Sequence, residues 1–582
     1  MVKFHAEYVM MKETKKGEGA MKLNYRRTMY VGFAFFLICA FWQAYDTTIP
    51  LILTNQFGLS QTASGVVMAL DNVLALFLLP LFGAISDRCR SRRGRRTPFI
   101  LAGTLAAVVA FMGLACTDGL QRQNLSSVIG VDDPAARRMV YVRQADTELQ
   151  YPDSLGRAED GRTFILRDLF TEDEFSKITA QLYYADDGNL YTTDETQKPL
   201  QLYPAELTEQ LRSDPAEFRS ITRTPDRVVT NPQYTNYVVP ARDACVWQTT
   251  AEKPLPLVLF VVLLLITLVA MATFRSPAVA LMPDVTVKPL RSKANAVINL
   301  MGSAGGTLVL VLGMVFATGS VRNSMMGYLP FFGAVAALML LALAVFLWRV
   351  REPRFVREME EESRRLAIDE AEPDLSGDRK LSKAERRSLI FLLTSIVFWF
   401  MGYNAVTSKY SVYATRVLDQ DYNLTLIIAQ AAAIAAYLPV GVLSSKLGRK
   451  KTILIGIVLL TASFLTACFL TRFSPGWLMN VMFVVAGVGW ATINVNSFPM
   501  VVEMSRGSDV GKFTGIYYAA SMAAQAVTPW VSGALMDRLG LTVLFPYAVV
   551  FVALAFGTML FVRHGDNKPA AKKGLEALNV ED

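Results

Sequence analysis

The chain has 582 residues, of which 52% are hydrophobic and only 19% are charged. Soluble domains carry about 25% charged residues, so the composition excludes an ordinary soluble protein. The net charge of +8 does not indicate a nucleic-acid partner, because most basic residues cluster in short loops between apolar runs. Composition therefore favours a membrane protein that lies in the lipid bilayer.

Apolar runs of about 20 residues recur along most of the chain, and each is long enough to cross about 30 Å of hydrocarbon. Short loops rich in Lys and Arg alternate with loops that have few, and basic loops stay in the cytoplasm. This asymmetry predicts a multi-pass protein of the cell membrane with two cytoplasmic tails, 1–27 and 564–582. We predict twelve spans, at 28–53, 62–85, 97–116, 255–281, 293–317, 326–350, 387–408, 424–445, 452–471, 476–500, 513–535 and 541–563.

Two polar segments interrupt these spans. Residues 117–254 contain 15 Lys and Arg against 23 Asp and Glu, and the alternation places them outside the cell. Strand-like runs at 139–142 and 162–166, with a helical pattern from Pro204 to Ser213, predict a small α+β domain. The alternative is a long, loosely structured loop. Residues 351–386 predict a cytoplasmic linker between the six spans of 28–116 and 255–350 and the six of 387–563.

The two sets of six spans repeat each other. The run from Phe41 to Asp46 in the first span is matched by the run from Phe398 to Asn404 in the seventh. The loop after the second span, 83–96, is likewise matched by 441–450 after the eighth. Parallel six-helix repeats suit a transporter whose halves rock around a central site. The predicted fold is an all-α membrane protein of twelve transmembrane helices in two repeats, with an extracytoplasmic α+β insertion.

The two repeated loops carry a recognisable motif. The first reads Ser86-Asp87-Arg88, then Gly94-Arg95-Arg96, and the second reads Gly448-Arg449-Lys450 with Ser445 in place of the acid. Both resemble the signature of the major facilitator superfamily. The longer first copy closely resembles plant sucrose–proton symporters and their animal relatives, and more loosely the glycoside–pentoside–hexuronide cation symporters. A second match to these symporters lies at Arg275, Asp284 and Asn295.

This resemblance implies a secondary active transporter, not an enzyme, that moves a sugar or glycoside with a cation by alternating access. It also implies that the loop motifs form a gate that locks the two halves together in one conformation. Charge that only sets the topology is the alternative for the arginines, but it does not explain Asp87. The implied gating residues are Gly83, Asp87, Arg88, Gly94, Arg95, Arg96, Gly448, Arg449 and Lys450.

Charged residues at membrane depth are functional candidates because they are costly to bury. Asp46 and Asp71 each lie eight or nine residues from the outer end of their spans, which places both roughly 12–14 Å deep. Two acids at matching depth oppose each other's ionisation, so that one can bind and release a proton near neutral pH. The alternative is a structural cap or packing hydrogen bond.

Arg275 is the basic residue that lies well inside an otherwise apolar span, the fourth. The resemblance to sucrose symporters implies an arginine linked to substrate or proton here, since a guanidinium can hold sugar hydroxyls or pair with an acid. A structural pair with Asp284 is the alternative.

Amide and aromatic side chains in the spans are further candidates for a polyhydroxylated ligand. An amide in an apolar helix either bonds a neighbouring helix or binds ligand, and an aromatic ring either stacks on a sugar or belongs to the core. The candidates are Asn295, Asn299, Asn404, Asn494, Asn496, Trp42, Tyr45 and Tyr403, with Trp399 and Trp490 as further aromatics.

The remaining expectations concern cysteines, cofactors and the alternative function. Cys116 and Cys245 bracket the outer segment and are candidates for a disulfide. We expect no metal site and no cofactor other than the coupling ion, H⁺ or Na⁺, and we expect a monomer. A non-transporting receptor or sensor, with 117–254 as its ligand-binding domain, is the alternative from another class.

Overall fold

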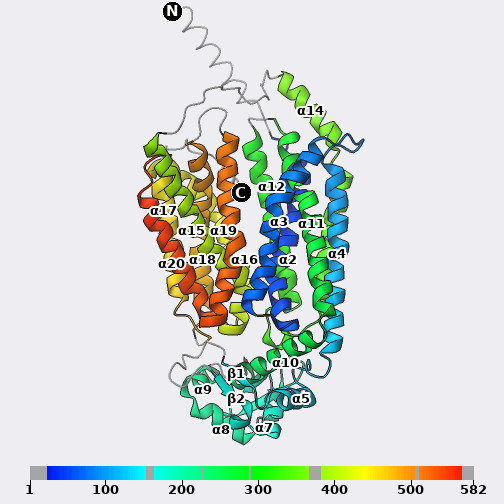
Figure 1. Ribbon diagram of the computed structural model, residues 1–582, viewed down its shortest axis with the longest axis vertical. Helices are drawn as coiled ribbons and strands as arrows, with labels where there is room; N and C mark the ends of the chain where they lie inside the picture. The colour runs from blue at the N-terminus through cyan, green and yellow to red at the C-terminus, as the bar shows by residue number, and fades with distance from the viewer. Residues whose placement is uncertain are drawn as a thin grey trace, which may run out of the picture.

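The computed structural model describes residues 23–151, 163–223, 227–287, 290–365, 382–472, 474–504 and 510–565. Two groups of long helices stand side by side in Figure 1. A segment of short helices and strands lies at one end of the bundle, and helix α14 (Glu352–Arg365) lies at the other. We call these the sheet end and the α14 end.

Each group of helices has its own apolar core, and apart from Leu51, which joins the second core, the residues of the two cores come from different halves of the chain. The first group consists of α2 (Tyr25–Leu51), which continues as the π-helix η1 (Ile52–Gln56), α3 (Gln61–Asp87), α4 (Thr97–Asn124), α11 (Leu255–Asp284), α12 (Arg291–Val315) and α13 (Leu329–Arg349). The second consists of α15 (Lys383–Tyr413), which continues as η6 (Ala414–Leu418), α16 (Tyr422–Leu447), α17 (Arg449–Ala467), α18 (Gly476–Val502), α19 (Val510–Leu539) and α20 (Leu544–Leu560).

Ten helices among the described residues are long and apolar enough to cross a membrane. A shorter apolar helix, Tyr422–Tyr437, lies within α16. The predicted multi-pass helical architecture is therefore present, whereas the full count of twelve spans stays a prediction. Helices α4 and α15 continue past residues 116 and 408, where the third and seventh predicted spans end.

The segment between α4 and α11 holds both helices and strands. Strands β1 (Glu148–Gln150) and β2 (Thr163–Ile165) form one antiparallel pair. A four-stranded antiparallel sheet, in the order β5-β4-β3-β6, is built from β3 (Gln181–Tyr184), β4 (Leu190–Thr193), β5 (Pro199–Leu202) and β6 (Arg227–Thr230). The helices of this segment are α5 (Pro134–Gln144), α6 (Leu166–Leu169), α7 (Glu172–Lys177), α8 (Ala205–Ser213), α9 (Pro215–Thr222), η3 (Tyr234–Val238) and α10 (Val239–Glu252).

Two local predictions for this segment have opposite outcomes. The helical pattern from Pro204 to Ser213 is confirmed as α8, whose Leu207 and Leu211 are buried four residues apart. The prediction of a strand at 139–142 is wrong, because these residues lie inside α5. This helix has Asp133 as its N-cap and Pro134 in its first turn. One face of α5 buries Ala136 and Val140, which are four residues apart, as the period of a helix requires. The apolar run at 139–142 is too short to show this period.

Cys116 and Cys245 do not form the disulfide that their placement allows, since both are free thiols. Cys116 is exposed on α4, whereas α10 places Cys245 in the apolar core of the inserted segment. Burial raises the pKa of the Cys245 thiol to about 11, so little thiolate is present at neutral pH.

Buried polar contacts join the two groups of helices at the sheet end. The Asp537 carboxylate on α19 accepts the Gln61 and Thr62 backbone N–H groups, both at 2.7 Å, and so caps the first turn of α3. Arg472, after α17, pairs with Glu217 of the inserted segment at 3.3 Å, and both side chains are more than nine-tenths buried. Arg416 on η6 pairs with Asp243 at 2.7 Å and donates to Asn55 at 2.5 Å. The inserted segment therefore bridges both groups.

Arg472→Ala should loosen the sheet end, because it leaves the Glu217 charge buried without its cationic partner, a loss of about 3 kcal/mol. We expect the mean distance between spin labels at Gln420 and Ser213 to lengthen, and its distribution to broaden, in double electron–electron resonance measurements. Arg219→Ala, which removes an exposed arginine from the same neighbourhood, should leave the distance unchanged. Identical distributions for Arg472→Ala and the parent would exclude a bridging role.

Candidate functional site

A small group of charges lies in the middle of the first half. Asp46 is on α2, Asp71 on α3 and Arg275 on α11. The charges of Asp71 and Arg275 both act on Asp46, and the charge of Arg275 also acts on Asp71. Asp71 accepts a 2.6 Å hydrogen bond from the Asn72 amide. The sequence-predicted acids and arginine therefore meet in one central group.

The exposure of Asp46 differs from that of its neighbours on α2. It is exposed, although the residues around it on α2, from Ala44 to Tyr45 and from Thr47 to Leu53, are all buried. From Leu76 to Ile85, between Asp71 and the α14 end, no residue of α3 is fully buried. This stretch of α3 still packs on α11, where Gly83 faces Ser276.

Aromatic side chains line the same group. The Arg275 guanidinium carbon lies 5.5 Å from the Trp42 ring centroid, a cation–π geometry. Trp42 and Tyr45 meet edge to face at 5.3 Å. In the described part of the chain, the Trp42 Nε1 and the Tyr45 hydroxyl are buried and have no hydrogen-bond partner. Such groups are rare in native structures, and here they lie beside the charges.

The candidates in the second half differ in what they contact. Tyr403 on α15 stacks on Trp490 of α18, with centroids 3.7 Å apart and an interplanar angle of 3°. The Asn404 amide donates to the Phe400 carbonyl of its own helix. Asn496 is buried between the Thr492 carbonyl and the Ser444 hydroxyl, contacts that favour helix packing over ligand binding.

Three other candidate amides lie on helices of both halves. Asn494 is buried on α18, and Asn295 and Asn299 are half-buried on α12. Two glutamines that sequence reasoning missed also lie between the halves, where Gly306 of α12 is close to both Gln43 and Gln430. The Thr307 hydroxyl donates to Gln430 of α16 at 3.0 Å. Gln43 is three residues before Asp46 and shares its helix face, a spacing that could have identified it.

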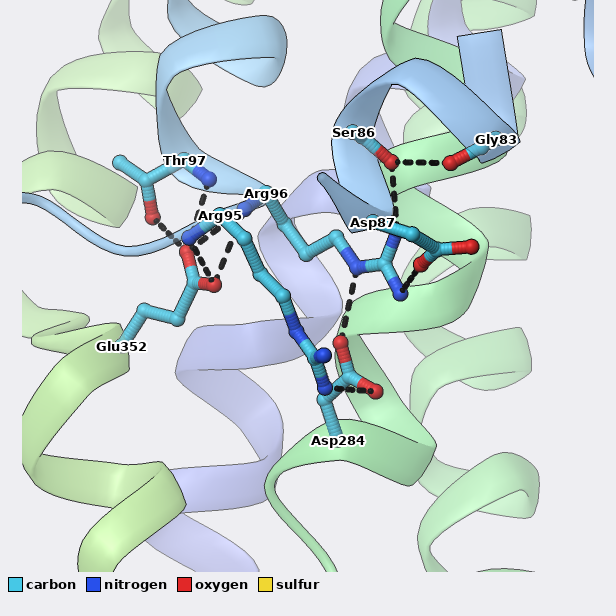
Figure 2. A network of polar contacts seen from close by, with 8 residues as sticks. All are labelled: Gly83, Ser86, Asp87, Arg95, Arg96, Thr97, Asp284 and Glu352. Atoms are coloured by element: carbon cyan, nitrogen blue, oxygen red, sulfur yellow. Dashed lines mark hydrogen bonds and ion pairs between the residues drawn. The ribbon is translucent and has the colours of Figure 1, made fainter. Parts of the chain in front are cut away.

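The predicted gate of the first half is a compact ionic network, shown in Figure 2. Arg96 pairs with Asp87 at 2.5 Å and with Asp284 at 2.8 Å, and it also donates to the Ser86 hydroxyl. Arg95 reaches Asp284 at 3.1 Å. Asp284 is therefore engaged by the loop arginines, and the alternative pair of Arg275 with Asp284 is not seen among the described residues.

Glu352 completes this network, and the sequence analysis did not single it out. Its carboxylate, which Figure 2 shows beside the loop, accepts the backbone N–H groups of Arg95, Arg96 and Thr97 and the Thr97 hydroxyl at 2.7–3.1 Å. Glu352 is 1% exposed. It thus caps the N-terminus of α4, where the helix dipole favours an anion. A Cβ at Gly94, whose φ is +106°, would lie 2.2 Å from the Glu352 Cδ, so only glycine fits there.

Other members of the predicted gate have simpler surroundings. Arg88 is exposed, and Gly83 faces Ser276 of α11, whose hydroxyl would lie 2.9 Å from an added Cβ. In the second copy, Gly448 has a φ of +92° at the junction of α16 and α17. Arg449 pairs with Glu503, and Lys450 donates to the Leu560 and Val562 carbonyls. The ion pairs Arg95–Asp284 and Arg449–Glu503 are counterparts in the two repeats.

Comparison with known families matches this arrangement. The model of the Major Facilitator Superfamily matches residues 245–435 and 417–579, and the model of the MFS/sugar transport protein family matches residues 30–129. The chain belongs to the major facilitator superfamily. This confirms the resemblance seen in the loop motifs and favours a transporter over the receptor alternative.

Curated relatives of this superfamily member match over short stretches. Solute carrier family 45 member 4 of Mus musculus is 37% identical over 99 residues, which are 16% of this chain and 13% of the relative. Proton-associated sugar transporter A of Homo sapiens is 37% identical over 92 residues, 16% and 12% of the two chains. Sucrose transport protein SUC4 of Arabidopsis thaliana is 39% identical over 58 residues, 10% and 11%. The chain thus matches only about one eighth of these relatives' length.

Solved structures share the fold of this superfamily member. A D-xylose-proton symporter aligns with a TM-score of 0.51 at 15% identity, covering 93% of this chain and 98% of that one. A bacterial homologue of the iron transporter ferroportin in its inward-facing state aligns with a TM-score of 0.53 at 11% identity, covering 93% and 99%. Identities this low show the fold and nothing finer.

Lys409 is a buried basic residue that the sequence analysis missed, because the seventh span was predicted to end at residue 408. It is fully buried on α15 and donates to the Gln61 backbone carbonyl at 2.9 Å. The charge of Asp537 acts on it across the junction of α3 and α19. Lys409 therefore belongs to the contacts that hold the sheet end of this transporter fold together.

Glu352→Ala should destabilise the fold by about 2–3 kcal/mol, because it leaves several buried N–H groups of α4 without an acceptor. Asp87→Asn should cost about 1 kcal/mol or less, since the Asp87 side chain is 58% exposed. Thermal unfolding of purified protein in detergent measures both. Glu360→Ala, an exposed acid on the same helix, is the matched control, and equal midpoints for Glu352→Ala and Glu360→Ala would contradict the capping role.

Proposed function

We propose that this chain is a secondary active transporter that moves a sugar or glycoside across the cell membrane together with H⁺ by alternating access. The observation that carries the proposal is the central group, in which Asp46 and Asp71 lie within electrostatic range of each other and of Arg275. A receptor has no need of such charges at the middle of its spans.

Proton coupling is supported by the surroundings of the two acids. Two neighbouring carboxylates are in general harder to ionise together than either one alone, and a nearby guanidinium favours the ionised form. Protonation of one acid therefore changes how strongly Arg275 is held, which links a proton to the groups around the arginine. Sodium is the second candidate ion, since a carboxylate pair also suits a hard cation.

A polyhydroxylated substrate is supported by the donors beside the charges. The Trp42 Nε1 and the Tyr45 hydroxyl, which have no partner among the described residues, and the Arg275 guanidinium all offer hydrogen bonds, while the ring of Trp42 offers an apolar face. Sugars present both hydroxyls and apolar C–H faces. Two curated relatives are described as a proton-associated sugar transporter and a sucrose transport protein, in agreement with this substrate class.

The proposal includes the topology. We infer twelve spans, a monomer, both termini and α14 in the cytoplasm, and the inserted segment outside the cell. The basic α3–α4 loop at the α14 end supports this orientation. The closed sheet end and the exposed Asp46 then correspond to a state in which the central group faces the cytoplasm.

Asp71→Asn and Asp46→Asn should each be tested for uphill accumulation and for substrate exchange in proteoliposomes. If one acid carries the proton, its Asn variant should lose accumulation and keep exchange, because exchange moves substrate both ways without net proton release. Arg275→Ala should instead weaken substrate binding in both assays. An imposed pH gradient, applied with and without a sodium gradient, identifies the ion.

The matched control for coupling is Val73→Ala, which truncates an exposed side chain of α3 close to Asp71 in sequence and keeps both acids. It should retain accumulation. If both Asp→Asn variants accumulate substrate like the parent, the acids are structural and the coupling mechanism is wrong.

The orientation predicts which surfaces an impermeant thiol reagent reaches in intact cells. A cysteine at Ser213, exposed on α8, should react from outside, and a cysteine at Glu360, exposed on α14, should react only after permeabilisation. Labelling of the Glu360 cysteine in intact cells would reverse the assigned sides.

A further inference from the structure

A hollow of about 770 Å³ at the α14 end is separate from the central group. Five arginines line it: Arg92 and Arg93 from the loop between α3 and α4, Arg351 directly before α14, and Arg354 and Arg357 on α14. The remaining lining residues are Thr97, Leu347, Val350, Pro353, Glu358 and Glu361. We call this hollow the arginine pocket.

The arginine pocket has an excess of positive charge. All five arginines are exposed. Glu358 already pairs with Arg27 at 3.0 Å and with Arg354 at 2.6 Å. Within the described ranges, Arg92, Arg93 and Arg351 have no ion pair, so several guanidinium groups remain for a bound anion.

The pocket also has an apolar side, which lies where membrane helix α13 ends. Leu347, Val350 and Pro353 form part of its wall. Beside them, Trp348 is 71% exposed, and the Arg349 guanidinium lies 3.9 Å from its ring centroid. Exposed Trp residues flanked by Arg are typical of the level of the lipid headgroups. Farther along α13, Leu341 is 65% exposed, which offers an apolar surface for acyl chains.

We propose that the arginine pocket binds the phosphate headgroup of an anionic phospholipid from the cytoplasmic leaflet. This inference uses the proposed orientation but not the proposed substrate or coupling ion. Arginine clusters immediately beside a membrane helix on the cytoplasmic side recognise anionic headgroups. Guanidinium groups bind phosphate oxygens bidentately, and the apolar wall next to α13 favours a phosphate that carries acyl chains over a soluble one.

The bound headgroup would contact both parts of the first-half gate. Arg92 and Arg93 belong to the loop whose next residues are held by Glu352, and Arg351 directly precedes Glu352. A phosphate between the loop and α14 therefore joins the same two elements as the Glu352 cap. Occupancy of the pocket reinforces the gate in the conformation described here.

The test is lipid binding by the full-length, delipidated protein in detergent, followed by native mass spectrometry. Phosphatidylglycerol is titrated against the parent and against Arg92→Gln/Arg93→Gln, with phosphatidylcholine as the neutral lipid. We expect the double variant to raise the Kd for the first phosphatidylglycerol about ten- to thirty-fold and to leave phosphatidylcholine binding unchanged. The matched control is Arg364→Gln/Arg365→Gln, which removes the same charge from the same end outside the pocket and should bind like the parent.

Three outcomes would overturn the proposal. Equal weakening in the two double variants would assign the effect to diffuse positive charge. Displacement of the lipid by equimolar glycerophosphoglycerol, the deacylated headgroup, would assign the pocket to a soluble phosphate compound. Unchanged binding in Arg92→Gln/Arg93→Gln would remove the site.

A variant that is expected to tighten lipid binding, instead of weakening it, keeps the test decisive if the loss of two arginines disturbs folding. Glu361→Gln removes an acid from the pocket lining and should tighten phosphatidylglycerol binding several-fold, whereas Glu360→Gln on the neighbouring exposed face should do so less. Weaker or equal binding by Glu361→Gln would contradict the proposal. None of these measurements depends on transport, so failure of the sugar–proton hypothesis would leave their outcome interpretable.

Discussion

A charge inside a membrane-spanning bundle requires a partner, because the hydrocarbon offers it neither water nor counterions. This constraint organises the structure. Arg96, with a side chain only 6% exposed, is held by Asp87 and Asp284, and the buried Lys409 donates to Gln61. The central group is the contrast, since Asp46 is exposed in an otherwise buried stretch of α2. A carboxylate that keeps access to water retains the ability to exchange a proton or to meet a polar ligand.

The same constraint separates two kinds of polar residue in the bundle. Asn496 and Glu352 have their hydrogen-bonding capacity used within the protein, so they hold elements together. The Tyr45 hydroxyl and the Trp42 Nε1 are buried without a partner among the described residues. Unpartnered buried atoms also occur elsewhere in the described part of the chain, on Trp399, Tyr410 and Tyr547 among others. What distinguishes the central group is that two such groups lie next to the Arg275 guanidinium.

Sequence reasoning identified the features that depend on local pattern. The apolar runs, the repeated loop motif and the α8 periodicity follow from spacing that can be counted along the chain. The matching membrane depth of Asp46 and Asp71 was inferred in the same way and stays a prediction. It missed features that depend on distant partners: Glu352 caps a helix that begins 255 residues earlier in the chain. The strand predicted at 139–142 was wrong for a different reason. Four apolar or aromatic residues fit a strand as well as a helix, and the N-cap at Asp133 is the signal that favours the helix.

The inserted segment leaves the bundle from α4 and returns through α11, and these two helices pack along each other. The chain itself therefore ties the segment to the first half, while its attachment to the second half depends on Arg416 and Arg472. In the proposed orientation this attachment lies outside the cell, where an antibody fragment can bind across it. A fragment that bridges the segment and the second half would oppose the rocking of the proposed transport cycle without entering the central group.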